Sequence, residues 1–260
     1  GISVNNAVDV AKDTADMILL HKSLGELIEG VVEGRRTFAN TLKYLMMALS
    51  SNFGNMFSMA GASLLLPFLP MLAPQILLNN LLYDVSQIAL PTDNVDESSI
   101  KRPHRLSISG IRKFMFVFGP LSSIFDFVTF WVLINVFHLQ AASFQAGWFL
   151  ESMLTQTLVV YIIRTRKVPF LQSTPSKSLI ASTLFAIGMS VLFVVTPLAT
   201  FFRFDSIPAD SFIWITVIVA VYLAFAQIVK TIFYKHISLW RAGEQPRTPA
   251  APQTLPHSAN

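Results

Sequence analysis

Six stretches of mostly apolar residues recur along the chain, separated by shorter polar segments. A bilayer core needs about 20 such residues per helix. The pattern therefore predicts six membrane-spanning helices, at residues 45–66, 74–90, 114–137, 144–163, 179–202 and 212–233. The second stretch is the shortest and most polar. The uncharged segment before it, from Pro67 to Ala73, holds two prolines and predicts a tight turn between paired helices.

Composition supports a membrane protein. Only 13% of the residues are charged and 53% are hydrophobic, whereas soluble domains carry about 25% charged residues. The chain has no Cys, which excludes disulfides and thiolate metal sites. We expect membrane lipid as a partner and no nucleic acid.

The basic residues predict an orientation. Of the 19 Lys and Arg residues, all but Arg203 fall before the first span, after the second, after the fourth, or at and beyond the end of the sixth. Basic residues gather on the cytoplasmic side of membrane proteins. Both termini should therefore be cytoplasmic, as an even number of spans requires.

The two ends differ from the apolar middle. Residues 1–23 read as a strand (1–4), a helix (7–15) and a second strand (17–20), which is the edge of an α/β domain. Twenty residues cannot bury a core alone. Residues 241–260 are rich in Pro, Thr, Ala and Gln and predict a disordered tail.

No proline interrupts residues 24–66. One helix of that length would measure about 65 Å, so residues 24–44 would form a stalk below the first span. The alternative is two helices broken near Gly30 or Gly34. The fold class we expect is an all-α polytopic membrane protein: a six-helix bundle within residues 45–240, a long stalk helix and a short N-terminal α/β remnant.

Polar side chains inside spans are costly and suggest function. Asn52 and Asn55 share a face of the first span. In the second span Asn80, Asp84 and Gln87 share a face, with Asn79 and Tyr83 beside them. In the third span Asp126 stands alone among apolar residues. In the fourth span Glu151, Thr155 and Gln156 form a loose polar stripe.

Oxygen ligands of this kind suit a hard cation such as Mg²⁺ or Ca²⁺. We expect Asn52, Asn55, Asn80 and Asp84 as ligands. Asp126 and Glu151 are further candidates, and Tyr83, Gln87 and Gln156 would stand behind the ligands. Alternatively, the amides join helices through hydrogen bonds worth about 0.6 kcal/mol each. Asp126 could also carry a proton or serve as a structural hydrogen-bond partner.

Ordered motifs resemble those of P-type ATPases. The run GISVNNAVDVAKDTADMILL followed by KSLGELIEGVVEGRRTFANTLKYL resembles the end of their phosphorylation domain and their stalk. SSNFGN and NNLLYD look like their fifth and sixth membrane helices. YDVSQIALPTDNVD, FGPLSSIFDF and QTLVVYIIRTRKVPF resemble the bacterial magnesium-transporting branch, and the likeness covers about residues 1–240.

The resemblance implies that Asn52, Asn55, Asn80 and Asp84 occupy ion-site positions. Calcium pumps have Glu where Asn55 stands and Thr where Tyr83 stands; these differences lower the negative charge of the site and favour one ion over two. The family's magnesium members bring Mg²⁺ across the bacterial inner membrane into the cytoplasm while ATP phosphorylates an Asp.

The motifs DKTGT, TGE and GDGxND are not in this sequence. The resemblance therefore implies a C-terminal fragment whose partner is the N-terminal half of the pump, with ATP and its Mg²⁺ bound by domains outside this chain. We expect no ATP hydrolysis from the fragment alone. The alternatives are another P-type branch (Ca²⁺, Na⁺/K⁺ or H⁺) or a truncated protein that regulates a full pump. A self-contained secondary transporter is disfavoured, because spans one to three and four to six show no inverted repeat.

Overall fold

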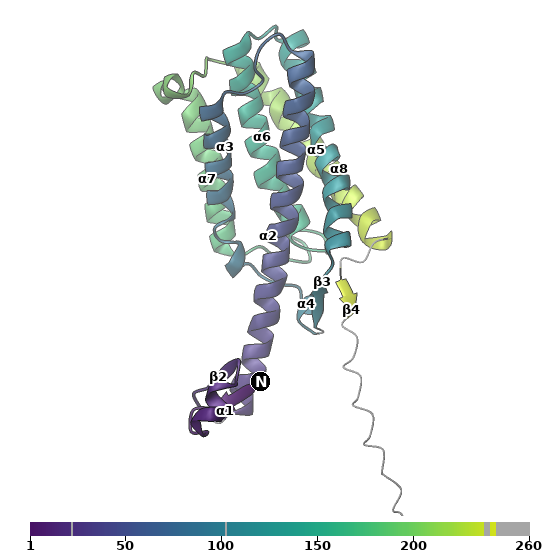
Figure 1. Cartoon of the computed structure of the whole chain (residues 1–260). Coiled ribbons are helices and arrows are strands. Elements are labelled where there is room, and N and C mark those ends of the chain that lie inside the picture. The colour runs from purple at the N-terminus through teal and green to yellow at the C-terminus, as the bar shows by residue number, and fades with distance from the viewer. Residues whose placement is uncertain (22, 102, 237–239, 243–260) are drawn as a thin grey trace, which may run out of the picture.

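A computed structural model describes residues 1–21, 23–101, 103–236 and 240–242. Helices make up most of these residues, and the long ones stand side by side in one bundle (Figure 1). The main helices are α2 (Leu24–Leu65), α3 (Ala73–Gln87), α5 (Ile108–Trp131), α6 (Ala141–Ile163), α7 (Lys177–Val195) and α8 (Ala209–His236). This is the all-α membrane-type fold that the sequence predicts.

The stalk is one unbroken helix. α2 runs for 42 residues, and its lower half extends below the bundle in Figure 1. The hydroxyl of Ser23 accepts a hydrogen bond from the Glu26 amide and caps its start. The helix continues through Gly30 and Gly34 without a break. A Cβ at either glycine would meet nothing within 4 Å, so neither marks a close contact. The single-helix prediction is confirmed.

The lower end of the stalk carries the strand–helix–strand piece that the sequence predicts. β1 (Ile2–Val4) pairs in parallel with β2 (Met17–Leu19), and α1 (Asp9–Asp13) connects them. Several apolar side chains of this piece are exposed, among them Val8, Val10 and Leu20. Two short strands and five helical residues cannot bury them, as expected for the edge of a larger domain.

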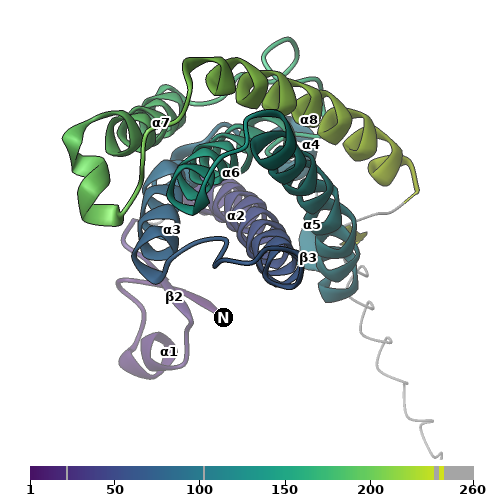
Figure 2. The same ribbon diagram turned by 90° about the horizontal axis from the view of Figure 1, so that it is seen from above.

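Within the described residues, four helices are long and apolar enough to cross a membrane: α5 with its π-helical extension, α6, α7 and α8. α3 has only 15 residues and several polar side chains, and the upper half of α2 is similarly polar. Both nevertheless lie within the bundle beside the other four (Figures 1 and 2). Six spans therefore stay a prediction.

α6 is the central helix. Seen from above, it lies inside a ring formed by the other five (Figure 2), and it contacts all of them. Nearly all of its residues are buried, including Trp148, Phe149 and Met153. A helix surrounded by protein has no solvent or lipid face, so its polar side chains must find partners on neighbouring helices.

α2 and α5 approach closely through glycines. A Cβ at Gly54 would collide with the Ser122 hydroxyl and lie 3.0 Å from the Gly119 carbonyl oxygen. A Cβ at Gly61 would meet the Phe127 ring at 2.5 Å. Small residues let membrane helices pack backbone to backbone, and here they bring α2 against α5.

A buried cluster of charges holds the lower end of the bundle together. The Asp93 carboxylate accepts hydrogen bonds from Lys43 of α2 (2.9 Å) and from Arg164 at the end of α6 (2.7 Å). It also accepts the backbone amide of Ser176, just before α7 (3.0 Å). Asp93 follows the short helix η1 (Leu90–Thr92). We call Lys43, Asp93 and Arg164 the charge cluster.

Burial alone would raise the pKa of Asp93. The hydrogen bond from Arg164 and the adjacent charge of Lys43 outweigh burial and hold the pKa of the carboxyl below its ordinary value. The stabilisation from the ionised group is therefore present above about pH 4 and is lost as the pH falls through the lowered pKa.

Lys230 of α8 closes the end of α6. Its ammonium group, fully buried, donates to the carbonyl oxygens of Ile162 (3.0 Å), Thr165 (3.1 Å) and Lys167 (2.9 Å). Carbonyls at a helix C-terminus lack partners in their own helix and attract cations. One side chain thus satisfies three acceptors and fixes α8 to the loop after α6.

Some boundaries differ from the predicted ones. The third span continues as a π-helix (Val132–Val136), and the fifth ends at Val195 before a 3₁₀-helix, η3 (Pro197–Phe202). Pro197 explains that end, since it cannot continue the hydrogen bonding of α7. The sequence also did not predict α4 (Glu97–Ile100) or the antiparallel pair β3 (His104–Leu106) and β4 (Trp240–Ala242). The predicted disordered tail lies outside the described residues beyond Ala242.

Replacing Asp93 with Ala should destabilise the fold by about 3–5 kcal/mol, because Lys43 and Arg164 would stay buried without their carboxylate. The measurement is the free energy of unfolding of the purified protein in detergent at pH 7. The control is Glu33→Ala, which breaks the exposed Arg36–Glu33 pair and should cost less than about 1 kcal/mol. Equal losses in the two variants would contradict the role of the cluster.

Candidate functional site

The predicted ligands of α2 and α3 line two grooves along the seam between these helices. Asn52, Asn55 and Asn80 line the upper groove, together with Asn79 and Ser152. Asp84 and Gln87 line the lower groove, nearer the stalk, with Asn40, Thr41 and Tyr44. The side chains of Asn52, Asn80 and Asp84 are exposed along this seam. The structure thus places the predicted carboxylate and the predicted Asn residues of α2 in neighbouring grooves.

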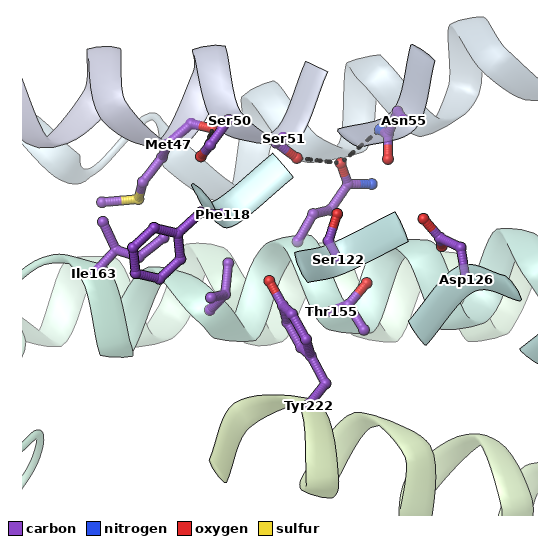
Figure 3. Close-up of a pocket in the computed structure, with 12 residues that line it drawn as sticks. Met47, Ser50, Ser51, Asn55, Phe118, Ser122, Asp126, Thr155, Ile163 and Tyr222 are labelled. Carbon is purple, nitrogen blue, oxygen red and sulfur yellow. Dashed lines mark hydrogen bonds between the residues drawn. The ribbon is translucent and has the colours of Figure 1, made fainter. Parts of the chain in front are cut away.

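Gln156 of α6 connects the two helices that form the seam. Its side-chain oxygen accepts hydrogen bonds from Ser51 (3.1 Å) and Asn55 (3.3 Å) of α2. Its amide nitrogen donates to the side-chain oxygen of Asn79 on α3 (2.9 Å) and to the Ser152 hydroxyl (3.5 Å). In Figure 3 the dashed lines from Ser51 and Asn55 meet at one oxygen.

These hydrogen bonds orient the two Asn amides in opposite ways. Asn55 uses its nitrogen on Gln156, so its oxygen is turned away and is available as a ligand (Figure 3). Asn79 uses its oxygen on Gln156 and keeps its amide hydrogens for other partners. Because a cation binds oxygen, Asn55 is oriented as a ligand in this structure and Asn79 is oriented as a donor.

Asp126 and Glu151 form a second buried polar group, between α5 and α6. Asp126 accepts hydrogen bonds from the Ser58 hydroxyl (2.5 Å) and the Trp148 indole N–H (3.0 Å). The Glu151 carboxyl group lies beside that of Asp126 and makes no hydrogen bond of normal geometry to another described residue. Two adjacent carboxyl groups among apolar side chains cannot both be ionised cheaply, so they can hold a proton or a cation between them.

A small internal cavity separates this pair from the seam. It has a volume of about 20 Å³, which accommodates one water molecule. Its polar lining comes from α2, α5, α6 and α8 and comprises Ser50, Ser51, Asn55, Ser122, Asp126, Thr155, Gln156 and Tyr222 (Figure 3). Asn55 lines both the cavity and the upper groove. It therefore contacts both spaces.

The sequence interpretation missed part of this polar set. Ser51, Asn55 and Ser58 follow one another at intervals of four and three residues, so they share one face of α2. That face points at α6 and α5, through Gln156 and Asp126. The spacing was available in the sequence, whereas the partner on α6 was not. Asn40 was also missed, because it lies below the predicted span.

The described residues contain no group of three or more His, Asp or Glu side chains that could hold a metal ion. The seam instead offers one carboxylate, Asp84, and several carboxamide oxygens. A Mg²⁺ ion needs six oxygen ligands in an octahedron and is often held by one or two carboxylates. The seam can supply some of these ligands; water or other polypeptide would have to supply the rest.

Comparison with known proteins gives consistent results. Residues 68–232 match the family described as cation transporting ATPase, C-terminus. Over 245 residues the chain is 49% identical to the magnesium-transporting ATPase, P-type 1, of Escherichia coli strain K12, which covers 93% of this chain. It is 42% identical over 244 residues to a protein of the same name from Salmonella typhimurium strain LT2, covering 92% of this chain. A calcium-transporting ATPase of Bacillus subtilis is 31% identical over 113 residues, 43% of this chain and 13% of that protein.

The chain spans 27% of the length of each of the two magnesium-transporting relatives. The similarity therefore concerns the part of those proteins that corresponds to this bundle and its stalk. Most of their length has no counterpart in this chain of 260 residues.

Replacing Gln156 with Leu should loosen the seam, because α2 and α3 would lose the side chain that joins Ser51 and Asn55 to Asn79. Spin labels on cysteines introduced at the exposed positions Met56 and Leu77 report the distance between the helices, and the chain has no native Cys to interfere. We expect a broader distance distribution in Gln156→Leu.

The matched control is Gln227→Leu on α8, which removes a Gln whose side-chain oxygen has no hydrogen-bond partner among the described residues. Its distance distribution should equal that of the parent protein. An unchanged distribution in Gln156→Leu would show that Gln156 does not hold the seam.

Proposed function

Because the chain belongs to the cation-transporting ATPase family, we propose that it is the C-terminal membrane part of a P-type pump that imports Mg²⁺ into the cytoplasm. The single observation that carries the choice of ion is the 49% identity, across 93% of this chain, to a protein named as magnesium-transporting. ATP hydrolysis would occur in domains of the longer protein, joined to this bundle through the stalk.

In this proposal the seam between α2 and α3 supplies one side of the transport site. Asn52, Asn55, Asn80 and Asp84 coordinate the ion, and Asp126 and Glu151 are further ligands or a proton-holding pair. Tyr83, Gln87 and Gln156 support them. Asn52, Asn80 and Asp84 are exposed at membrane depth, where polar groups facing lipid would be costly. Their exposure supports a transport site of which this chain supplies only one side. The helices of the pump's N-terminal half would cover them and complete the site.

A low negative charge supports Mg²⁺ over Ca²⁺. Calcium sites in proteins use six to eight oxygens and commonly several carboxylates, whereas Mg²⁺ retains water and needs only one or two. The seam offers Asp84 and otherwise neutral oxygens.

The orientation follows from the basic residues. Apart from Arg203, which follows η3, the described Lys and Arg residues lie on the N-terminal piece, on the stalk or at the stalk's end of the bundle. We propose that this end faces the cytoplasm, that both termini lie there, and that the protein resides in a bacterial inner membrane. The stalk then extends into the compartment that holds ATP.

In the full-length protein, Asp84→Asn should abolish Mg²⁺ uptake and raise the Mg²⁺ concentration for half-maximal ATPase stimulation roughly tenfold or more, through loss of the seam's carboxylate. The assay holds MgATP constant and varies free Mg²⁺. Asp210→Asn, an exposed Asp in the first turn of α8, is the control and should behave as wild type. Wild-type Mg²⁺ stimulation in Asp84→Asn would refute the role of Asp84. Stimulation of the wild-type protein by Ca²⁺ instead of Mg²⁺ would refute the ion assignment.

A further inference from the structure

Gln156 limits how the two Asn amides that it joins can be oriented. Its side chain is buried and has one oxygen and one NH₂ group, which meet different helices. The oxygen accepts a hydrogen bond from Asn55 on α2, and the NH₂ group donates one to Asn79 on α3. An amide that accepts on one side and donates on the other must meet opposite ends of its two neighbours.

The two Asn side chains therefore present opposite ends to the space that remains. Both line the upper groove. Asn55 keeps its oxygen free, whereas Asn79 keeps its NH₂ group free. Asn79 is 4% exposed, yet its nitrogen is not among the enclosed polar atoms that lack a hydrogen bond in the described chain. We conclude that this NH₂ group reaches the groove.

Reversing all three amides would leave the count of ligands unchanged. Asn55 would then present its NH₂ group and Asn79 its oxygen. The hydroxyls of Ser51 and Ser152, which also contact Gln156, could follow, because a hydroxyl both donates and accepts. In either arrangement the pair gives the groove one oxygen and one NH₂ group, so two Asn residues supply a single ligand.

The number of available oxygens affects the choice between hard cations. Ca²⁺ takes about six to eight oxygen ligands in flexible geometry, whereas Mg²⁺ takes about six and keeps several of its waters. The NH₂ group of Asn79 is a donor and cannot bind a cation. It occupies a position at the groove where an amide oxygen would favour Ca²⁺.

We propose that Gln156 is a positioning residue that sets ion choice: it holds the NH₂ group of Asn79 toward the upper groove, withholds one oxygen from the ion and so favours Mg²⁺ over Ca²⁺. The inference rests on the proposed function, because it concerns the same transport site. Gln156 is not among the described residues that line the upper groove, and it acts through the Asn amides.

Gln156→Glu tests the proposal, because an ionised Glu accepts hydrogen bonds on both sides. Asn79 can then donate to it and turn its oxygen into the groove. We measure the dissociation constants of Ca²⁺ and Mg²⁺ by calorimetry on the full-length protein in detergent without nucleotide, and subtract the heat that remains in Asp84→Asn. We expect the ratio of the two constants to shift toward Ca²⁺ by about tenfold or more.

A double variant separates an added oxygen from an added charge. Gln156→Glu combined with Asn79→Leu keeps the carboxylate but has no amide to turn, so the ratio should return to within about threefold of wild type. A shift toward Ca²⁺ that persists in the double variant would overturn the proposal, because charge alone would then explain it. An unchanged ratio in Gln156→Glu would overturn it as well.

Two single variants test the same count without changing Gln156. Asn55→Leu removes an oxygen ligand and should weaken Mg²⁺ binding about tenfold or more, whereas Asn79→Leu removes only an NH₂ group and should weaken it less than about threefold. Equal losses, or a greater loss in Asn79→Leu, would contradict the proposal. Wild-type protein that shows no Asp84-dependent Mg²⁺ binding would refute the proposed function itself. Intact Mg²⁺ binding with an unchanged ratio in Gln156→Glu would refute this inference alone.

Discussion

The arrangement depends on one constraint: α6 is enclosed by protein, so its polar side chains lie against other helices and not against water or lipid. Gln156 forms hydrogen bonds to α2 and α3, and the Glu151 carboxyl group lies beside that of Asp126 on α5. The carbonyls at its end are satisfied by Lys230 of α8. A polar central helix therefore fixes the positions of four of its neighbours, which apolar packing alone would determine only loosely.

The seam between α2 and α3 shows the opposite condition. Its Asn52, Asn80 and Asp84 side chains are exposed, and the two helices are joined by Gln156 rather than by an apolar interface of their own. At the height of the lower groove, the charge cluster joins α2 through Asp93 to the segment after α3 and to the end of α6. The seam is thus held at two heights by residues outside it, which leaves its own oxygens free for a ligand.

Much of this could be predicted from the sequence. The recurring apolar stretches indicated the long helices, and the lack of proline indicated the unbroken stalk, because helix formation depends on local composition. The amide and carboxyl residues of the seam were found from helical spacing. What could not be predicted were pairings across distant segments. Asp93 sits in a loop with no local signal of burial, and its partners Lys43 and Arg164 are 50 and 71 residues away. The orientation of the Asn55 and Asn79 amides likewise depends on a side chain of another helix.

The unbroken stalk helix has a mechanical consequence. α2 is held near its middle by Lys43, and at 1.5 Å per residue its ends lie about 29 Å below and about 33 Å above that point. Above that point α2 packs against α5 through Gly54 and Gly61. Because no break interrupts the helix between its lower end and this contact, a displacement of the stalk cannot be absorbed within α2. It would have to carry α5 along with α2, so these two helices form one mechanical unit.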